Sequence, residues 1–336
     1  MSNPQTNSDG ENRNRKPFKK VAMTFVRWGI ILLVMIWVIR EVVLTGRDVA
    51  NYQWKLHIGW ASAAVISYLV GYLPAGIYWH IILRKLGQKP TLYRSLRAYY
   101  IGHLGKYIPG KAMVVALRAG LIRDESVKTS VAVVCVFLET LTMMAVGAMI
   151  SAIFLIIFFH DQIQLMLVAF GLMAVSGLPV VPFFFRKLVR IAGLVKTDEE
   201  TLLALNHFDA KLLFCGIGLM TVAWFFLGVS LCTTICGVGI SIGDSWFVVL
   251  RRLPRFITAS ALSTVAGFLS MIPGGFGVRE LVLFELMQPY FNDAALPTGL
   301  TPRAAGLVVA GVTRLVSIVS ELALSIILYL IRSKSG

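Results

Sequence analysis

The sequence predicts an all-α protein that crosses a membrane several times, and three observations support this. Hydrophobic residues make up 57% of the 336 residues and charged residues only 15%, whereas about 25% of a typical soluble domain is charged. The mean hydropathy is +0.76. The apolar residues lie in long unbroken runs, not in the ~10-residue alternating segments of a transmembrane β-barrel. Soluble enzymes, disordered proteins and fibrous proteins are therefore excluded.

Six apolar runs are long enough to be full transmembrane helices, because about 20 residues rising 1.5 Å each cross a ~30 Å hydrocarbon core. Residues 1–20 are polar and basic, and we expect a disordered cytoplasmic tail there. Residues 21–332 are expected to form a single transmembrane domain. The six runs cover roughly residues 22–43, 58–83, 127–158, 161–185, 211–239 and 304–331.

Two further apolar stretches are interrupted near their middles. Residues 93–123 break at Tyr107–Lys111, and residues 254–291 break at Ile272–Gly277. Proline lacks an amide donor and glycine loosens the backbone, so each stretch is predicted to be a broken or re-entrant hairpin of two short helices. In lipid, such a break is tolerated only where it is buried in protein or lines a wet cavity. The competing interpretation is a full pair of tilted spans at each place.

The two halves of the chain repeat the same pattern. Residues 58–158 and residues 211–331 each run as span, broken hairpin and span. An odd number of crossings separates the hairpins, so one is expected to enter from each side of the membrane. Inverted repeats of this kind are common in secondary transporters, and their binding sites lie near the middle of the bilayer.

The basic residues predict the orientation of the chain. The net charge is +15, but the Lys and Arg residues lie mostly between apolar runs, which favours membrane orientation over nucleic-acid binding. With the N-terminus in the cytoplasm, the segments on that side carry twenty Lys and Arg residues and the opposite side carries seven. We therefore expect both termini in the cytoplasm.

Each break is followed by a restarting helix whose N-terminus is expected to lie inside the membrane. Free amides and the helix dipole make such an end attractive to an anion, and a phosphate headgroup suits the basic residues nearby. The alternative is a simple tight turn with basic side chains that extend to the interface. The candidate substrate-binding residues are His103, Lys106, Pro109, Gly110, Lys111, Arg118, Gly274, Gly275, Arg279 and Glu280.

Three further charges, Glu139, Arg314 and Glu321, lie deep in predicted spans. An isolated charge there costs roughly 3 kcal/mol on insertion scales, so all three are expected to face the protein interior and pair. We expect Arg314 to bridge Glu139 and Glu321. The network is either a structural lock between helices or a gate that rearranges during transport.

Other polar residues carry weaker signals. Tyr99, Tyr100 and Tyr107 fit interfacial anchors, with substrate contact as the alternative. The four cysteines form no C-x-x-C pair and the five histidines no metal-ligand spacing, so we expect neither a metal site nor a cofactor. The sequence contains no G-x-S-x-G, Walker A, H-E-x-x-H or Rossmann fingerprint, and no catalytic residue is predicted.

Two stretches of the chain resemble the signatures of one family, the lysylphosphatidylglycerol synthetase transmembrane region, also described as the flippase-like domain. The resemblance extends over about residues 20–332. It rests on Ala98–Lys111 (AYYIGHLGKYIPGK) with Arg118 and Glu139, and on Pro273–Glu280 (PGGFGVRE) with Arg314 and Glu321.

The resemblance implies a bacterial or archaeal inner-membrane protein that handles lipids. In full-length relatives this region moves an aminoacylated phospholipid between leaflets, and a separate soluble domain makes that lipid from aminoacyl-tRNA. No such domain is expected here, so the synthetase activity is not carried over. Some stand-alone relatives are tied to polyprenyl-linked or other glycolipids.

We therefore predict a lipid flippase or lipid transporter for an anionic or modified phospholipid, or for a polyprenyl lipid or glycolipid. Membrane lipids with anionic headgroups are the expected partners, with a separate lipid-synthesising enzyme as a further candidate and no nucleic acid. One alternative is an intramembrane lipid-modifying transferase with Glu139, Glu280 or His103 as its acid or base. The other is a lipid-binding partner that transports nothing.

Overall fold

The structure is a computed structural model that confirms an all-α fold suited to a membrane. It describes scattered positions between 36 and 50, and then residues 54–108, 112–123, 127–158, 163–191, 205–243, 245–270, 272–294 and 296–333. The tail and most of the first predicted run lie outside the described residues. Within the described part of the chain, four helices are long and apolar enough to cross a membrane, at Ile58–Lys85, Thr129–Ile157, Ala210–Gly237 and Pro302–Ile331.

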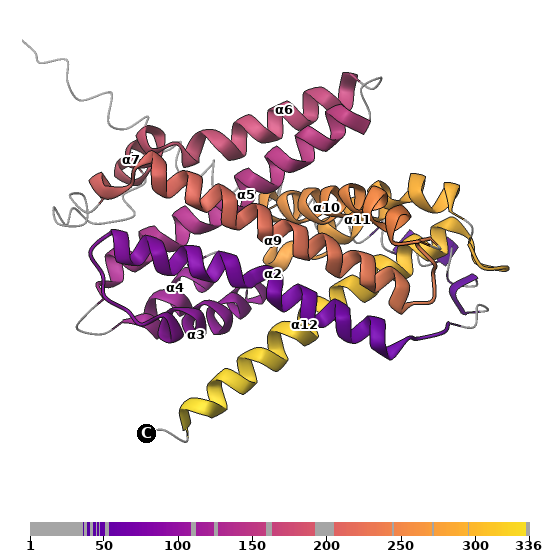
Figure 1. Cartoon of the computed structure of the whole chain (residues 1–336), viewed down its shortest axis with the longest axis horizontal. Coiled ribbons are helices and arrows are strands. Elements are labelled where there is room, and N and C mark those ends of the chain that lie inside the picture. The colour runs from indigo at the N-terminus through magenta and orange to yellow at the C-terminus, as the bar shows by residue number, and fades with distance from the viewer. Residues whose placement is uncertain are drawn as a thin grey trace, which may run out of the picture.

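The order of elements is the same in both halves, as the sequence predicts (Figure 1). Each half has a long helix, a hairpin interrupted by a short 3-10 helix (η), and a second long helix. The first half contains α2 (Ile58–Lys85), α3 (Leu92–His103), η1 (Leu104–Tyr107), α4 (Ala112–Ile122) and α5 (Thr129–Phe158). The second contains α9 (Ala210–Gly237), α10 (Trp246–Leu269), η4 (Pro273–Gly275), α11 (Val278–Asp293) and α12 (Pro302–Ser333).

Side-chain caps start three of these helices. The carboxylate of Asp209 accepts the amide N–H of Leu212 at 2.8 Å at the start of α9. The hydroxyl oxygens of Thr91 and Ser245 similarly cap α3 and α10. These residue types satisfy amides that have no partner within the helix itself, so the chain enters both hairpins at defined points.

The helices of the first hairpin are short. The helices α3 and α4 have 12 and 11 residues, about 18 and 17 Å of helix, whereas the hydrocarbon core is ~30 Å thick. These lengths favour a broken or re-entrant hairpin over two full spans. In the second hairpin, α11 has 16 residues, about 24 Å, and α10 is longer but carries charged residues in its first turns.

The helices α2 and α9 form the central pair and run antiparallel (Figure 1). At one end, the amide N–H of His57 donates to the carbonyl of Gly237 at 2.9 Å. At the other end, Gly216 lies against Tyr78, whose ring leaves no room for a Cβ there. Because each half begins with one of these two helices, the two halves run in opposite directions through the bundle.

The remaining helix contacts are exchanged between the halves. The helix α5 packs on α9 and α10, and correspondingly α12 packs on α2 and α3. The two breaks η1 and η4 also contact each other. This is the packing that an inverted repeat requires, and it brings both interruptions to one place inside the bundle.

The helix α5 is fixed against α9 by Trp224. The indole N–H of Trp224 donates to the carbonyl of Met143 at 3.0 Å. Its ring occupies the space where a Cβ on Gly147 would lie, 2.7 Å away. This contact places the inner face of α5, which carries Glu139, opposite the first hairpin.

One predicted span is not a continuous helix. Residues 161–185 are expected as one helix, but α6 (Ile163–Gly177) ends before a short η2 (Leu178–Val180), and α7 (Pro182–Ile191) follows. Pro179 and Pro182 cannot donate amide hydrogen bonds to a continuing helix, which explains the interruption.

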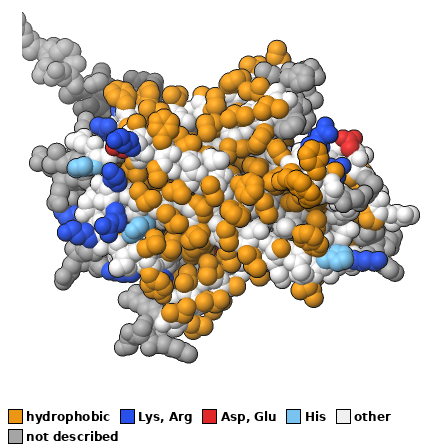
Figure 2. Space-filling model, in the orientation of Figure 1, with side chains coloured by type: hydrophobic (Ala, Val, Ile, Leu, Met, Phe, Trp, Pro, Cys, Tyr) orange, Lys and Arg blue, Asp and Glu red, His pale blue; other side chains and the backbone are white. Residues whose placement is uncertain are grey.

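Hydrophobic side chains cover the middle of the visible face, and Lys and Arg gather toward its two ends (Figure 2). This distribution matches a bundle whose apolar band lies in lipid and whose charged ends lie near headgroups. The chain is therefore a multi-pass membrane protein. Which end faces the cytoplasm stays a prediction.

Candidate functional site

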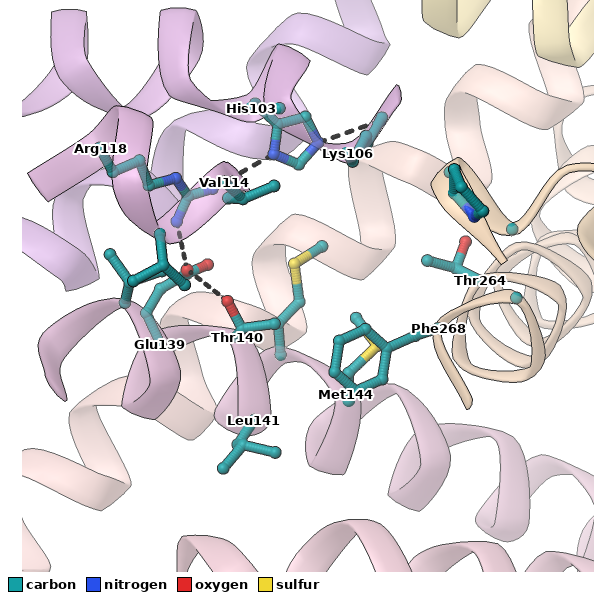
Figure 3. Close-up of a pocket in the computed structure, with 18 of the residues that line it drawn as sticks. His103, Lys106, Val114, Arg118, Glu139, Thr140, Leu141, Met144, Thr264 and Phe268 are labelled. Atoms are coloured by element: carbon teal, nitrogen blue, oxygen red, sulfur yellow. Dashed lines mark hydrogen bonds and ion pairs between the residues drawn. The ribbon is translucent and has the colours of Figure 1, made fainter. Parts of the chain in front are cut away.

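A cavity of about 240 Å³ lies between the first hairpin, α5, the end of α10 and the η4 break. Figure 3 shows His103, Lys106 and Arg118 on the side of the first hairpin, and Thr264 and Phe268 of α10 across from them. Both predicted breaks line this cavity. The two hairpins that the sequence singled out thus enclose one hollow.

The buried pair Arg118–Glu139 forms one wall of the cavity. The Nη1 atom of Arg118 lies 2.6 Å from Oε2 of Glu139, and both side chains are 2% exposed. The hydroxyl of Tyr99 donates to Oε1 of Glu139 at 3.2 Å, and the Arg118 guanidinium lies 4.0 Å from the centre of the Tyr99 ring. Gly102 permits this approach, because a Cβ there would lie 2.4 Å from Cγ of Arg118.

His103 joins two cations at the centre of the first hairpin. Its Nδ1 lies 3.2 Å from Nη2 of Arg118, and its Nε2 lies 3.1 Å from Nζ of Lys106. A guanidinium only donates, so Nδ1 of His103 accepts the bond from Arg118.

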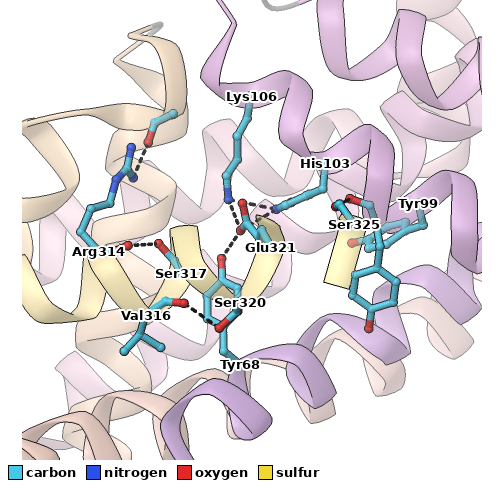
Figure 4. A network of polar contacts seen from close by, with 12 residues as sticks. Tyr68, Tyr99, His103, Lys106, Arg314, Val316, Ser317, Ser320, Glu321 and Ser325 are labelled. Carbon is cyan, nitrogen blue, oxygen red and sulfur yellow. Dashed lines mark hydrogen bonds and ion pairs between the residues drawn. The ribbon is translucent and has the colours of Figure 1, made fainter. Parts of the chain in front are cut away.

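A second ion pair connects the two halves (Figure 4). The Nζ of Lys106, on η1, lies 2.5 Å from Oε1 of Glu321, on α12. The hydroxyl of Tyr68 donates to the same carboxylate oxygen, and Nε2 of His103 lies 3.6 Å from it. The Glu321 side chain is only 3% exposed, so its charge is balanced by Lys106 within the protein.

A third group of contacts holds the second break. The Nη1 of Arg314 donates to the carbonyl of Gly274 at 2.9 Å, and its Nε lies 3.5 Å from Oε1 of Glu280. The Oε2 of Glu280 accepts the amide N–H of Gly277 at 2.6 Å. Gly274, Gly275 and Gly277 have φ of 59°, 65° and 79°, left-handed values that other residues rarely adopt.

The expected bridge from Arg314 to both carboxylates is wrong. Glu139 pairs with Arg118, Glu321 pairs with Lys106, and Arg314 turns to the η4 break. The reason is geometric, because each hairpin reaches far enough into the bundle to offer a nearer partner than the neighbouring span does. All three charges face the interior, since their side chains are at most 9% exposed.

The start of α11, where an anion was expected to bind, is occupied by a side chain of the protein itself. The carboxylate of Glu280 accepts the Gly277 amide, so the helix end is occupied by a negative side chain of its own. Glu280 therefore caps the helix and faces Arg314, and it does not line the cavity. The other expected end involves Pro109, Gly110 and Lys111, which lie outside the described residues.

Arg279 differs from the other cations of the cavity. It lines the hollow from the first turn of α11. Among the residues that the structure describes, it has neither a carboxylate within ion-pair distance nor a hydrogen-bond partner, whereas Arg118 and Lys106 have both. Its guanidinium can therefore bind an anion without displacing a carboxylate of its own from within ion-pair distance.

The structure brings most candidate residues to the cavity. His103, Lys106, Arg118, Gly274, Gly275 and Arg279 all line it. Tyr99 is fully buried, not interfacial, and it bonds to Glu139. Tyr107 lies at the η4 break, with its ring centre 5.4 Å from the Arg314 guanidinium, so the interpretation as anchors is wrong for both.

Sequence reasoning missed two tyrosines of α2. Tyr68 bonds to Glu321, and the ring of Tyr72 contacts His103 at 4.6 Å between centres, with the two planes tilted by 56°. A signal for them exists, because they are four residues apart in a strongly apolar run and therefore share one helix face. A hydroxyl in such a run needs a partner inside the protein.

The chain matches the family of the lysylphosphatidylglycerol synthase TM region over residues 24–325, and it therefore belongs to that family. The match includes both halves and the described charged residues of the site. A comparison with curated proteins found no match. Family membership connects the chain with membrane lipids.

Proposed function

We propose that the chain moves an anionic lipid between the two leaflets of a bacterial or archaeal inner membrane, with its lipid phosphate beside Arg279. The observation that carries this proposal is a cation without an ion-pair partner among the described residues, facing a cavity inside an apolar bundle. A charge in such a place is costly unless it serves a ligand or a pathway. A phosphate oxygen accepts the bidentate hydrogen bonds that a guanidinium offers.

The walls of the cavity suit a lipid rather than a soluble anion. Apolar side chains of α5 and α10, among them Phe137, Met144 and Phe268, line the hollow beside the cations. A lipid matches both parts of the lining, because its phosphate can lie beside Arg279 and its acyl chain along these apolar side chains. A small soluble anion leaves the apolar wall without a partner.

The inverted halves supply a mechanism for exposing the site to either leaflet. Rocking of one half against the other is the usual motion of inverted repeats. The Lys106–Glu321 pair joins η1 of the first half to α12 of the second, so it must rearrange when the halves move. We propose that both termini lie in the cytoplasm and that the energy of transport does not come from a nucleotide bound to this chain.

Leaflet exchange in proteoliposomes tests this function. Fluorescent phosphatidylglycerol is reconstituted with the wild type, with Arg279→Gln and with the control Arg84→Gln, which removes an exposed arginine at the end of α2. We expect fast exchange for the wild type and the control, and at least tenfold slower exchange for Arg279→Gln, because a charge-assisted hydrogen bond contributes about 1.5–3 kcal/mol. Equal exchange by all three proteins contradicts the proposal.

The same vesicles separate transport from chemistry. Mass spectrometry after incubation should return the lipid with unchanged mass, whereas a transferase yields a product of altered mass. The candidate acids and bases are already engaged, since Glu139 bonds to Arg118 and Glu280 caps α11. Binding without exchange identifies a lipid-binding partner that transports nothing.

A further inference from the structure

Among the described residues that line the cavity, one cation has no ion-pair partner, and the one carboxylate is fully engaged. That cation is Arg279, which has no hydrogen bond and no carboxylate within ion-pair distance among the described residues. The carboxylate that lines the hollow among the described residues is Glu139, and both of its oxygens are taken. Oε2 accepts from Nη1 of Arg118 at 2.6 Å and from the hydroxyl of Thr140 at 3.3 Å, and Oε1 accepts from the hydroxyl of Tyr99 at 3.2 Å.

The aromatic rings of the first hairpin and α2 do not supply an alternative site for an ammonium group. A tyrosine ring attracts a cation through its negative face, but the Tyr99 ring already lies 4.0 Å from the Arg118 guanidinium. The Tyr72 ring has Nζ of Lys106 at 6.0 Å from its centre and packs against His103 in a tilted contact. A ligand ammonium near these rings meets the protein's own cations.

The balance of charges along the cavity also disfavours a ligand ammonium group. Lys106, Arg118 and Arg279 bring three positive charges, and Glu139 brings one negative charge. Glu321 and Glu280 lie outside the lining and are held by Lys106, by Arg314 and by the Gly277 amide. In a bundle of low polarity, these cations repel a ligand ammonium more strongly than they would in water.

We infer that this cavity selects lipids whose headgroup carries a phosphodiester and no amine, as in phosphatidylglycerol, and disfavours zwitterionic and aminoacylated lipids. The inference rests on the proposed function and narrows its substrate class. It also separates this chain from the lysylated lipid after which its family is named. A lipid with an ammonium group should bind weakly because the described lining offers no free carboxylate to pair with it. An anionic lipid should bind more tightly because Arg279 pairs with its phosphate.

Binding in detergent tests the selectivity without requiring transport. The thermal unfolding midpoint of the purified full chain is measured against added phosphatidylglycerol, phosphatidylethanolamine and lysyl-phosphatidylglycerol. Half-maximal stabilisation by phosphatidylglycerol is expected at a concentration at least tenfold lower than for the other two, which corresponds to about 1.4 kcal/mol. Equal stabilisation by the three lipids, or a preference for the lysylated lipid, overturns the inference.

Two matched pairs of variants locate the effect. Arg279→Gln should remove the preference and Arg84→Gln should retain it. Thr264 lines the cavity about one helical turn before Gly267, and a Cβ added at Gly267 would lie 3.3 Å from Cβ of Arg279. Thr264→Asp adds a carboxylate there and should weaken phosphatidylglycerol binding about tenfold more than Thr264→Asn, which has the same shape as Asp without the charge. If Asp and Asn behave alike, the electrostatic explanation is wrong.

The proposed function fails separately from this inference. Selective stabilisation without leaflet exchange retains the selectivity and rejects transport. Leaflet exchange that is equally fast for all three lipids, together with equal stabilisation, retains transport and rejects the selectivity. The wild-type comparison requires no variant, so a variant that does not fold leaves the test intact.

Discussion

In each half, a charged side chain on the hairpin contacts an opposite charge on the next long helix. We call this contact the tie, and its polarity is reversed between the halves. In the first half, the cation Arg118 on the hairpin helix α4 pairs with Glu139 on the following helix α5. In the second half, the carboxylate Glu280 on the hairpin helix α11 faces Arg314 on the following helix α12. Both ties connect the returning arm of a hairpin to the next long helix.

The reversal explains why the cavity is asymmetric. Because Glu280 serves Arg314 and the start of its own helix, the adjacent Arg279 keeps no carboxylate among the described residues. In the first half, Arg118 and Glu139 neutralise each other on the cavity wall. The first half thus builds a balanced wall, and under the proposed function the second half supplies the charge for the lipid phosphate.

Breaking the first-half tie should have the largest effect on stability. Arg118→Ala leaves the Glu139 carboxylate buried without its cation, and removal of one partner of a buried pair costs about 3–5 kcal/mol. Thermal unfolding in detergent should show a much lower midpoint. The control Arg123→Ala removes an exposed arginine at the end of α4 and should change little; equal losses for both variants contradict the assignment.

Exchanging the charges of this tie sharpens the comparison. Arg118→Glu combined with Glu139→Arg gives the first half the polarity of the second. The double variant should recover part of the stability that either single variant loses, because the two buried charges are again paired. A double variant that loses as much as the two single variants together shows that orientation, and not charge pairing, determines this contact.

The contact between the halves should rank next. Lys106→Met leaves Glu321 with the Tyr68 hydroxyl but without a cation. The free energy of unfolding should fall by about 2–3 kcal/mol, less than for Arg118 because Lys106 is more exposed, at 18% against 2%. Lys85→Met, at the exposed end of α2, is the control. An equally small effect of both variants would show that the Lys106–Glu321 pair does not stabilise the fold.

The second-half tie should be weaker than the first. Glu280→Gln keeps an oxygen that can accept the Gly277 amide, and Arg314 keeps its bond to the Gly274 carbonyl. We therefore expect a loss of about 1 kcal/mol in denaturant unfolding. Glu285→Gln, an exposed position on the same helix, should be neutral, and a loss at Glu280 as large as that at Arg118 refutes the proposed difference between the halves.

The smallest effect is expected at Tyr68. Tyr68→Phe removes one donor to Glu321 but leaves Lys106 in place. Interhelical hydrogen bonds in membrane proteins contribute about 0.6 kcal/mol on average, so the unfolding free energy should fall by about that amount. Tyr93→Phe, at an exposed tyrosine, provides the baseline.

The two hairpins were predictable from sequence because a Pro-Gly pair interrupts an apolar stretch at corresponding places in the two halves, at Pro109–Gly110 and Pro273–Gly274. The inward direction of Glu139, Arg314 and Glu321 was predictable as well, since lipid does not tolerate isolated charges. Their partners were not, because the pairing depends on how far each hairpin reaches and how each helix is rotated. Hydrophobic periodicity is weak in a helix such as α5, which is apolar all round.

The role of Glu280 was within reach of the sequence. A glutamate three residues after Gly277 stands at the third position of the restarting helix, where a side chain commonly folds back to a free amide. The unpaired state of Arg279 was not accessible, since it results from what Glu280, Arg118 and Lys106 each bind in the folded protein. The proposed selectivity of the cavity therefore rests on contacts that are visible only in three dimensions.

Photo-crosslinking from inside the cavity tests most directly whether Arg279 holds a lipid there. A benzophenone amino acid replaces Phe268 on the cavity wall or Phe214, which is 70% exposed on α9, in vesicles containing phosphatidylglycerol. The account predicts lipid adducts at both positions, and a loss of at least about tenfold at position 268 alone when Arg279→Gln is added. Adducts at position 268 that are unchanged by Arg279→Gln contradict it.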